Sequence, residues 1–71
     1  MLPDMQPVQS SNVARIGYEE DAEEVYVEFY NSGTYVYSGV PPIVFEDFER
    51  APSKGKFVNE VLKPRYACHR L

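Results

Sequence analysis

One short run, in which a strand turns directly into a helix, constrains the fold of this chain more than any other feature. Tyr35 and Tyr37 alternate with smaller residues, as in a half-buried strand, and Gly39 follows almost at once. Pro41 and Pro42 come next, and proline suits the first turn of a helix, where its missing N–H leaves no bond unmade. The run predicts a mixed α+β domain.

Two more alternating runs precede it, at residues 13–18 and 25–30, and an acidic cluster at 19–24 separates them. Such a cluster is typical of a solvated hairpin turn. A calcium loop needs acids at alternate positions and a glycine at the sixth, and this cluster has neither, so no metal site is predicted. In the first run the alternation predicts two opposite faces: Ala14, Ile16 and Tyr18 on one, and Val13, Arg15 and Gly17 on the other.

The hairpin before the tyrosine strand decides which way the tyrosines face. Residues 31–33 join the two strands, and Gly33 suits the left-handed position that closes a three-residue loop. The predicted pairs are Tyr30 with Thr34, Phe29 with Tyr35, and Val27 with Tyr37. This register places both tyrosines on the apolar core face, whereas a shift of one residue would place them on the open face.

Two short helices are expected after the strands. The first carries an apolar stripe until Pro52, and the second begins at Ser53, a good N-cap, and is expected to end at Pro64. The stripes consist of Val44, Phe45, Phe48 and Ala51, and of Phe57, Val58, Val61 and Leu62.

This order predicts an α+β fold in which a three-stranded antiparallel sheet, a β-meander, is followed by two short helices packed on one face. Residues 1–9 lack periodicity and are interpreted as a flexible N-terminal arm that can end in an edge strand. Residues 10–66 form the predicted domain, and residues 67–71 a C-terminal tail.

The chain has 71 residues, near the lower limit for folding without a metal, disulfides or a partner. Its hydrophobic fraction of 44% is that of a folded domain rather than a disordered one. The single cysteine, Cys68, cannot form an internal disulfide, and no apolar run approaches the roughly 20 residues of a membrane helix. Without a signal-peptide pattern, the chain is expected in the reducing cytoplasm, with no membrane partner.

Charge divides the chain in two. Residues 1–49 carry ten acids and one arginine, a net charge of −9, and residues 50–71 carry six basic residues and one glutamate, a net charge of +5. The overall charge of −4 argues against tight nonspecific DNA binding, but a local basic surface can still hold a nucleic acid. The alternative is that the two halves neutralise one another across the fold.

The ordered set of these residues resembles the KTSC domain, a family named for the C-terminal extension of some lysyl-tRNA synthetases. The resemblance covers residues 8–66 and rests on Ser10-Ser11-Asn12-Val13, Ile16-Gly17-Tyr18, Val25, Val27, Phe29, Tyr35, Tyr37, Val40-Pro41, Ala51, Ser53, Gly55, Phe57 and Asn59. It implies a stand-alone small protein of the kind found in bacteria and phages. RNA binding has been suggested for the family, and the resemblance brings no established catalytic residues.

The run Ser53-Lys54-Gly55-Lys56 is the best candidate for contact with an anion. A serine cap exposes the first N–H groups of a helix, the glycine lets a ligand approach the backbone, and two lysines stand beside it. The alternative is that the serine only caps the helix and the lysines face solvent. With the neighbouring cations, the predicted anion or nucleic-acid site comprises Arg50, Ser53, Lys54, Gly55, Lys56, Lys63 and Arg65.

A second candidate is an aromatic surface on the open sheet face. Tyr26 and Tyr30 are predicted to lie there beside Arg15, and aromatic side chains interleaved with arginine can stack single-stranded bases. Glu28 lies in the same face and repels phosphate, so cross-strand packing or a dimer contact is the alternative.

No enzyme is predicted. Cys68 and His69 are adjacent, whereas a nucleophile and its base must converge, and the chain has no other cysteine or histidine to complete a zinc site. No cofactor is expected. Two functions remain open: a small module that binds RNA or another nucleic acid through the basic side chains of residues 50–71, and a protein-interaction or self-associating adaptor, including a homodimer.

Overall fold

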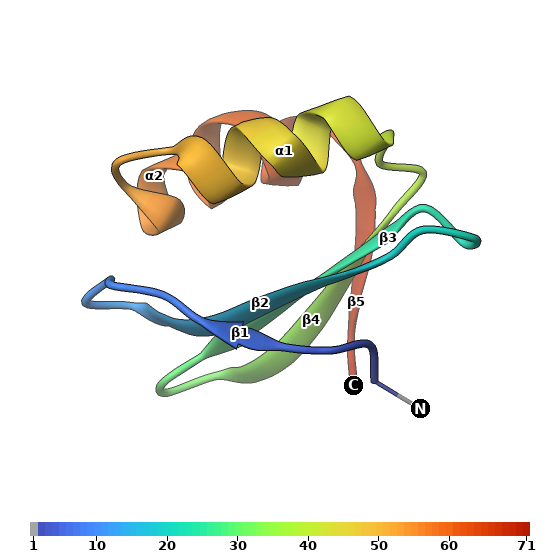
Figure 1. Ribbon diagram of the computed structural model, residues 1–71. Helices are drawn as coiled ribbons and strands as arrows, with labels where there is room; N and C mark the ends of the chain where they lie inside the picture. Colours follow the sequence, from blue (N-terminus) through green and yellow to red (C-terminus); the bar gives the residue numbers. More distant parts are fainter. Residues whose placement is uncertain (1) are drawn as a thin grey trace.

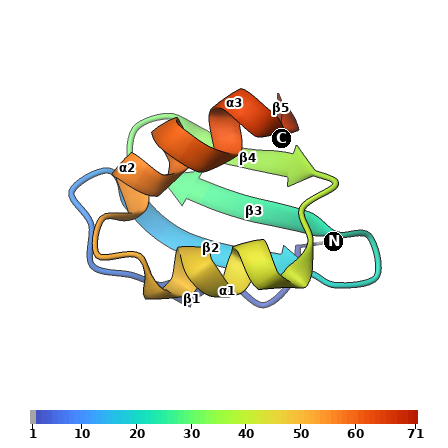
Figure 2. The same cartoon turned by 90° about the horizontal axis from the view of Figure 1, so that it is seen from above.

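The computed structural model describes residues 2–71, in which helices cover one face of an antiparallel sheet (Figure 1). The strands are β1 (Gln6–Pro7), β2 (Val13–Glu19), β3 (Glu24–Phe29), β4 (Gly33–Ser38) and β5 (Ala67–Arg70), and they lie side by side in chain order. The helices are α1 (Pro42–Arg50) and a second, continuous segment made of α2 (Lys54–Phe57), the π-helix η1 (Val58–Leu62) and α3 (Lys63–Arg65). Figure 2 shows α1 over the β2 side of the sheet and the α2–α3 segment over the β4 side.

The α+β class is confirmed, but the predicted three strands are two too few. From the N-terminal residues, β1 adds to β2, with Gln6 opposite Ile16. From the residues interpreted as a tail, β5 adds to β4, with Cys68 opposite Tyr37. Both added strands are short and mostly polar, so they carry too few apolar residues to show an alternating pattern. The sheet is five-stranded.

The β3–β4 hairpin keeps the predicted faces but not the predicted pairs. Its three-residue loop begins one residue earlier than expected, so Val27 lies opposite Tyr35 rather than Tyr37. The register therefore differs by two residues, which is a full side-chain repeat of a strand, and the tyrosines stay on the core face. Gly33 has the predicted left-handed conformation, with a φ of +85°, but it is the first residue of β4, opposite Phe29, rather than the last residue of the loop.

A β-bulge in β2 overturns the predicted division of that strand. Val13 and Arg15 lie opposite consecutive residues of β3, so Ala14 is an extra, unpaired residue. The bulge brings Val13 to the same face as Ile16, and both are buried in the core. A strict alternation would have placed them on opposite faces.

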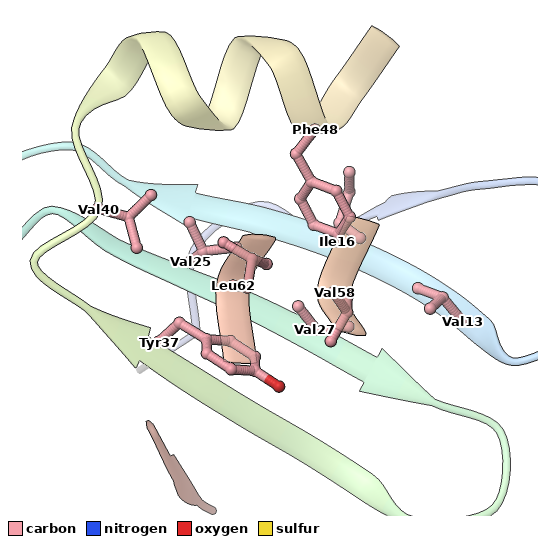
Figure 3. Packing of buried hydrophobic residues seen from close by; sticks show 9 residues of the cluster. All are labelled: Val13, Ile16, Val25, Val27, Tyr37, Val40, Phe48, Val58 and Leu62. Atoms are coloured by element: carbon pink, nitrogen blue, oxygen red, sulfur yellow. The ribbon is translucent and has the colours of Figure 1, made fainter. Parts of the chain in front are cut away.

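The core lies between the sheet and the two helical segments (Figure 3). Its buried side chains are Val13, Ile16, Val25, Val27, Tyr37, Val40, Phe48, Val58 and Leu62. Phe48 is fully buried and stacks on Phe57, with ring centroids 5.0 Å apart. This contact holds the two helical segments together over the sheet.

The second helical segment runs through Pro64 instead of ending there. Before the proline, the Lys63 N–H donates to the carbonyl oxygen of Val58, five residues back, as in a π turn. Proline lacks an N–H and interrupts the bond ladder of a helix, and a π turn is one of the places where a helix accommodates such a break. The segment ends at Arg65, one residue beyond the proline.

Candidate functional site

The predicted anion-binding run is used largely to join the two helical segments. The Ser53 hydroxyl accepts a 3.3 Å hydrogen bond from the Lys56 N–H and so caps α2. The Lys54 ammonium donates to the carbonyl oxygens of Glu49 at 3.1 Å and Ala51 at 2.6 Å, at the end of α1. The serine and one of the two lysines therefore have internal partners.

A cavity of about 450 Å³ lies beside the other lysine, Lys56. It is lined by Ala51, Pro52, Ser53, Lys56, Phe57, Glu60 and Val61. Glu60 shares the cavity with Lys56, and its carboxylate repels an anion there. Gly55 stands apart from the cavity and packs on the chain before β2, since a Cβ at this position would lie 3.5 Å from Asn12 Nδ2.

A second cavity, which we call the tyrosine cleft, lies between the π turn and strands β4 and β5. Its volume is about 250 Å³, and it is lined by Phe29, Ser32, Tyr35, Tyr37, Val58, Asn59, Lys63 and Cys68. The Phe29 and Tyr35 rings meet edge to face, with centroids 5.6 Å apart. Among these lining residues, no acidic side chain is present and Lys63 carries the positive charge. Of the predicted cations, the structure brings only this one to the cleft.

Tyr37 belongs to the core and to the tyrosine cleft at once. Its side chain is 2% exposed, and Figure 3 shows its hydroxyl at the edge of the buried cluster. Among residues 2–71, every fully enclosed side-chain nitrogen or oxygen has a hydrogen-bond partner. The Tyr37 hydroxyl has no partner in the protein, so it is not fully enclosed and is open to the cleft that Tyr37 lines. Burial, with smaller contributions from Cys68 and Tyr35, raises the pKa of Tyr37 to about 12. The phenol therefore keeps its proton near neutral pH.

The last strand brings two further groups to this side of the sheet. Cys68 lies opposite Tyr37 and Arg70 lies opposite Tyr35, so both share the face of the tyrosines. The Arg70 guanidinium covers the hairpin loop, because its Nε would lie 3.4 Å from a Cβ at Gly33. Sequence reasoning missed both groups, since it interpreted residues 67–71 as a tail.

The basic half of the chain is not neutralised by the acidic half through direct ion pairs. Across residues 2–71 the single salt bridge joins Arg15 and Glu28, both from the acidic half, with 2.6 Å between Nε and Oε1. Arg50, Lys56, Lys63 and Arg65 are exposed. Lys56, Lys63 and Arg65 belong to one helical segment, so three free cations follow a single element.

The predicted aromatic surface is largely engaged by neighbouring groups. The Arg15 guanidinium makes two hydrogen bonds to the Glu28 carboxylate, which lower the pKa of that carboxyl. The Tyr26 hydroxyl donates to Glu24 at 3.2 Å, and burial, followed by the charge of Glu24, raises the pKa of Tyr26. Tyr30 is 60% exposed. Of the two tyrosines, Tyr30 is the one whose ring is largely open.

The N-terminal residues also cover part of that face. A Cβ at Gly17 would lie 2.6 Å from Met5 Sδ and 2.8 Å from the Asp4 carbonyl oxygen, so residues 3–5 cross directly over the glycine. Tyr26 lies opposite Gly17 in the sheet. The far face of the sheet is therefore narrower than the open platform predicted from the strands alone.

Among residues 2–71, no three side chains of histidine, cysteine, aspartate or glutamate come together as a metal site would require. No helix in this part of the chain combines the length and apolar character needed to cross a membrane.

Comparison with known proteins agrees with this architecture. The family model described as KTSC domain matches residues 9–66. The chain belongs to the KTSC domain family. A crystal structure of a KTSC domain protein from Yersinia pestis superposes with a TM-score of 0.92 at 38% identity, and the match covers 96% of both chains.

Two relatives differ greatly in the share of their own length that matches this chain. A small protein of Tsukamurella paurometabola is 44% identical over 62 residues, covering 87% of this chain and 92% of that protein. A lysine–tRNA ligase of Nostoc punctiforme is 33% identical over 63 residues, but the match covers 89% of this chain and only 11% of the ligase. The KTSC chain is thus similar to nearly all of one small relative and to a short segment of a much larger protein.

Several residues of the KTSC pattern have structural roles here. The Ser10 hydroxyl accepts from the backbone N–H groups of Asn12 at 3.2 Å and Val13 at 3.1 Å, where β2 begins. Gly17 admits the N-terminal residues, and Ser53 caps α2. Because these residues stabilise turns, a close backbone contact and a helix start, the pattern indicates the KTSC fold rather than a particular reaction.

Proposed function

We propose that this chain is a small, non-catalytic module that binds single-stranded RNA through the basic side chains of its second helical segment and last strand. The single observation that carries the proposal is the set of exposed cations at Lys56, Lys63 and Arg65, which form no ion pair within residues 2–71. Free cations on one element can neutralise neighbouring phosphates and release their counterions. The similar segment in lysine–tRNA ligases, proteins named for a tRNA, supports RNA as the nucleic acid.

The residues of the predicted anion site fall into two groups with different roles. Lys54 and Ser53 are assigned to the helix junction because both have internal hydrogen-bond partners. Lys56, Lys63 and Arg65 are assigned to phosphate contact, and Arg70 joins them from β5.

The test is a titration of fluorescently labelled single-stranded RNA, and of a tRNA, at several salt concentrations. If Lys56, Lys63 and Arg65 each neutralise one phosphate of a single strand, log K falls with log salt with a slope of about −2. Changing these three residues together to glutamine should remove most of the binding and most of that slope. No binding at low salt would refute the proposed function.

A matched control separates local contacts from overall charge. Gln6→Glu, Gln9→Glu and Ala22→Glu lower the net charge by the same amount as the three glutamine changes, and all three positions are exposed and distant in sequence from the basic residues. Under the proposal this control keeps most of the affinity. Equal loss in both variants would mean that only net charge matters.

A second candidate, self-association, is favoured by the position of β5. This strand lies at an edge of the sheet and its four residues are exposed, so one row of backbone groups is open to pairing with another strand. Sedimentation velocity over a range of protein concentrations tests it. A concentration-dependent dimer supports the second function, and a strictly monomeric protein removes it.

A further inference from the structure

The tyrosine cleft is too small for a folded partner, and its mainly apolar wall contains several polar groups. Its volume of about 250 Å³ lies just below the range of roughly 300–1,000 Å³ that holds drug-sized molecules. A single flat ring with a small polar substituent fits such a space. The aromatic side chains of Phe29, Tyr35 and Tyr37 supply surfaces against which a ring can pack.

Polar groups enter the cleft from three different elements. Ser32 comes from the hairpin loop, Tyr37 from β4 and Asn59 from the π turn. The Tyr37 side chain is 98% buried, yet no hydrogen bond within residues 2–71 uses its hydroxyl, and burial keeps that hydroxyl protonated. A hydroxyl of this kind needs an acceptor, from a ligand or from water. Together these groups offer both donors and acceptors, which matches the edge of a nucleobase.

The charge around the cleft is positive. Lys63 is part of its wall, and Arg70 lies over Gly33 at the hairpin end. None of the described residues that line the cavity is an aspartate or a glutamate. A ligand with a flat ring and a nearby negative charge therefore fits better than a neutral or cationic one.

We propose that the tyrosine cleft holds one nucleobase, packed against Tyr35 and hydrogen-bonded by Tyr37 and Asn59, with its phosphate at Lys63. The ligand chemistry is that of a nucleotide, which can be a free nucleoside monophosphate or one unpaired nucleotide of an RNA strand. The RNA form rests on the proposed function and deepens it, because it places one splayed-out base beside the basic helical segment.

Cys68 provides a direct test, because it is the single cysteine of the chain, is exposed and lines the cleft. The rate of its alkylation by iodoacetamide is measured alone, with inorganic phosphate, with each of four nucleoside 5′-monophosphates, and with a short single-stranded RNA. The same RNA carrying one abasic position at its centre is the matched ligand. A bound base should slow alkylation, whereas phosphate alone should not.

Variants of residues in the cleft test whether the slower alkylation of Cys68 is caused by a ligand bound there. Tyr35→Leu should weaken binding of the base-containing ligand by about fivefold or more, the lower end of the range for loss of one aromatic stacking partner. Asn59→Ala should weaken it by about threefold or more, as expected for loss of one hydrogen bond. Tyr30→Leu removes an exposed tyrosine outside the cleft and should leave protection unchanged. Asn59 is exposed, so its truncation tests the site even if Tyr35→Leu fails to fold.

The outcomes separate this inference from the proposed function. RNA binding without protection of Cys68, and with equal affinity for the abasic strand, overturns the cleft as a base site and leaves RNA binding by the cations intact. Protection by monophosphates without any RNA binding supports the cleft and refutes the RNA function. If neither ligand binds, both proposals fail.

Discussion

The Tyr18 hydroxyl donates a 2.6 Å hydrogen bond to the carbonyl oxygen of Val40. The bond ties the end of β2 to the corner where the chain passes from β4 into α1. A second hydrogen bond holds the same corner, because the backbone N–H of Val40 donates to the Glu23 carbonyl oxygen at 2.9 Å. The Tyr18 ring also stacks on Phe45 of α1, with centroids 4.9 Å apart. One side chain thus fixes the position of α1 relative to the sheet.

Replacement of Tyr18 by phenylalanine should therefore destabilise the domain while keeping its fold. The ring stacking remains, but the hydroxyl is lost and the Val40 carbonyl oxygen loses its hydrogen-bond donor in a partly buried place. The expected loss is about 1 kcal/mol in the free energy of unfolding, measured by urea denaturation. Tyr30→Phe, at a position 60% exposed, serves as the control and should change the unfolding midpoint little. Equal effects of the two substitutions would contradict the role given to the hydrogen bond.

Alanine at two glycines should have effects of opposite sign. At Gly17 a new Cβ would lie 2.8 Å from the Asp4 carbonyl oxygen, so the N-terminal residues must move away, and stability should fall. At Gly55 the nearest atom, Asn12 Nδ2, would lie 3.5 Å away, and alanine favours the helix by up to about 1 kcal/mol. Thermal unfolding measures both, and hydrogen exchange of the backbone N–H groups between residues 4 and 8 should become faster only in Gly17→Ala. A stable Gly17→Ala variant with protected N-terminal amides would show that this covering is loose.

The ion pair on the far face should be visible in the titration of Glu28. Hydrogen bonds from Arg15 lower the pKa of this carboxyl, so Arg15→Gln should raise it towards its ordinary value. Because the folded-state pKa is the lower one, the pair stabilises the fold above the ordinary pKa of glutamate and loses that effect as the pH falls through the folded-state pKa. Carboxyl-carbon NMR titration measures the shift. An unchanged Glu28 titration in Arg15→Gln would mean that the pair is open in solution.

Alkaline pH should weaken the fold through Tyr37. Burial raises the pKa of Tyr37 to about 12, whereas tyrosine in an unfolded chain titrates near 10, so its contribution to stability is complete below pH 10 and is lost between about pH 10 and pH 12. Tyr37→Phe should reduce this alkaline loss without removing it, because burial also raises the pKa values of Tyr18 and Tyr26. Melting temperatures across pH 8–11.5 provide the measurement. Identical pH profiles for the two proteins would contradict the buried position of Tyr37.

The parts of the fold that the sequence predicted are those with strong local signals. The three central strands carry alternating apolar residues, Gly33 marks the hairpin, and proline and serine mark the helix starts at Pro42 and Ser53. The bulge at Ala14 is invisible to this reasoning, because alternation counts residues and a bulge inserts one. The burial pattern of β2 can be explained only from its pairing with β3.

The candidate site was harder to predict because it depends on residues far apart in the chain. Cys68 and Arg70 meet the tyrosines only through the pairing of β5 with β4, and β5 has no apolar alternation of its own. The basic character of residues 50–71 was evident from composition, but composition did not show which lysine has hydrogen-bond partners within the protein. Lys54 turns back to two carbonyl oxygens, and only the packing of α1 against α2 creates that arrangement.

The π turn at Val58–Leu62 sets the rotational phase of everything that follows it in the helix. Each residue of an α-helix advances the side-chain direction by about 100°, and a π turn adds one residue to a turn of otherwise helical backbone. The wide turn thus takes up one residue more than a regular α-helical turn would, so a relative without that residue would keep the side chain at the place of Lys63 pointing in nearly the same direction. The helix can therefore change length by one residue between residues 58 and 62 while Lys63 keeps its place in the wall of the tyrosine cleft.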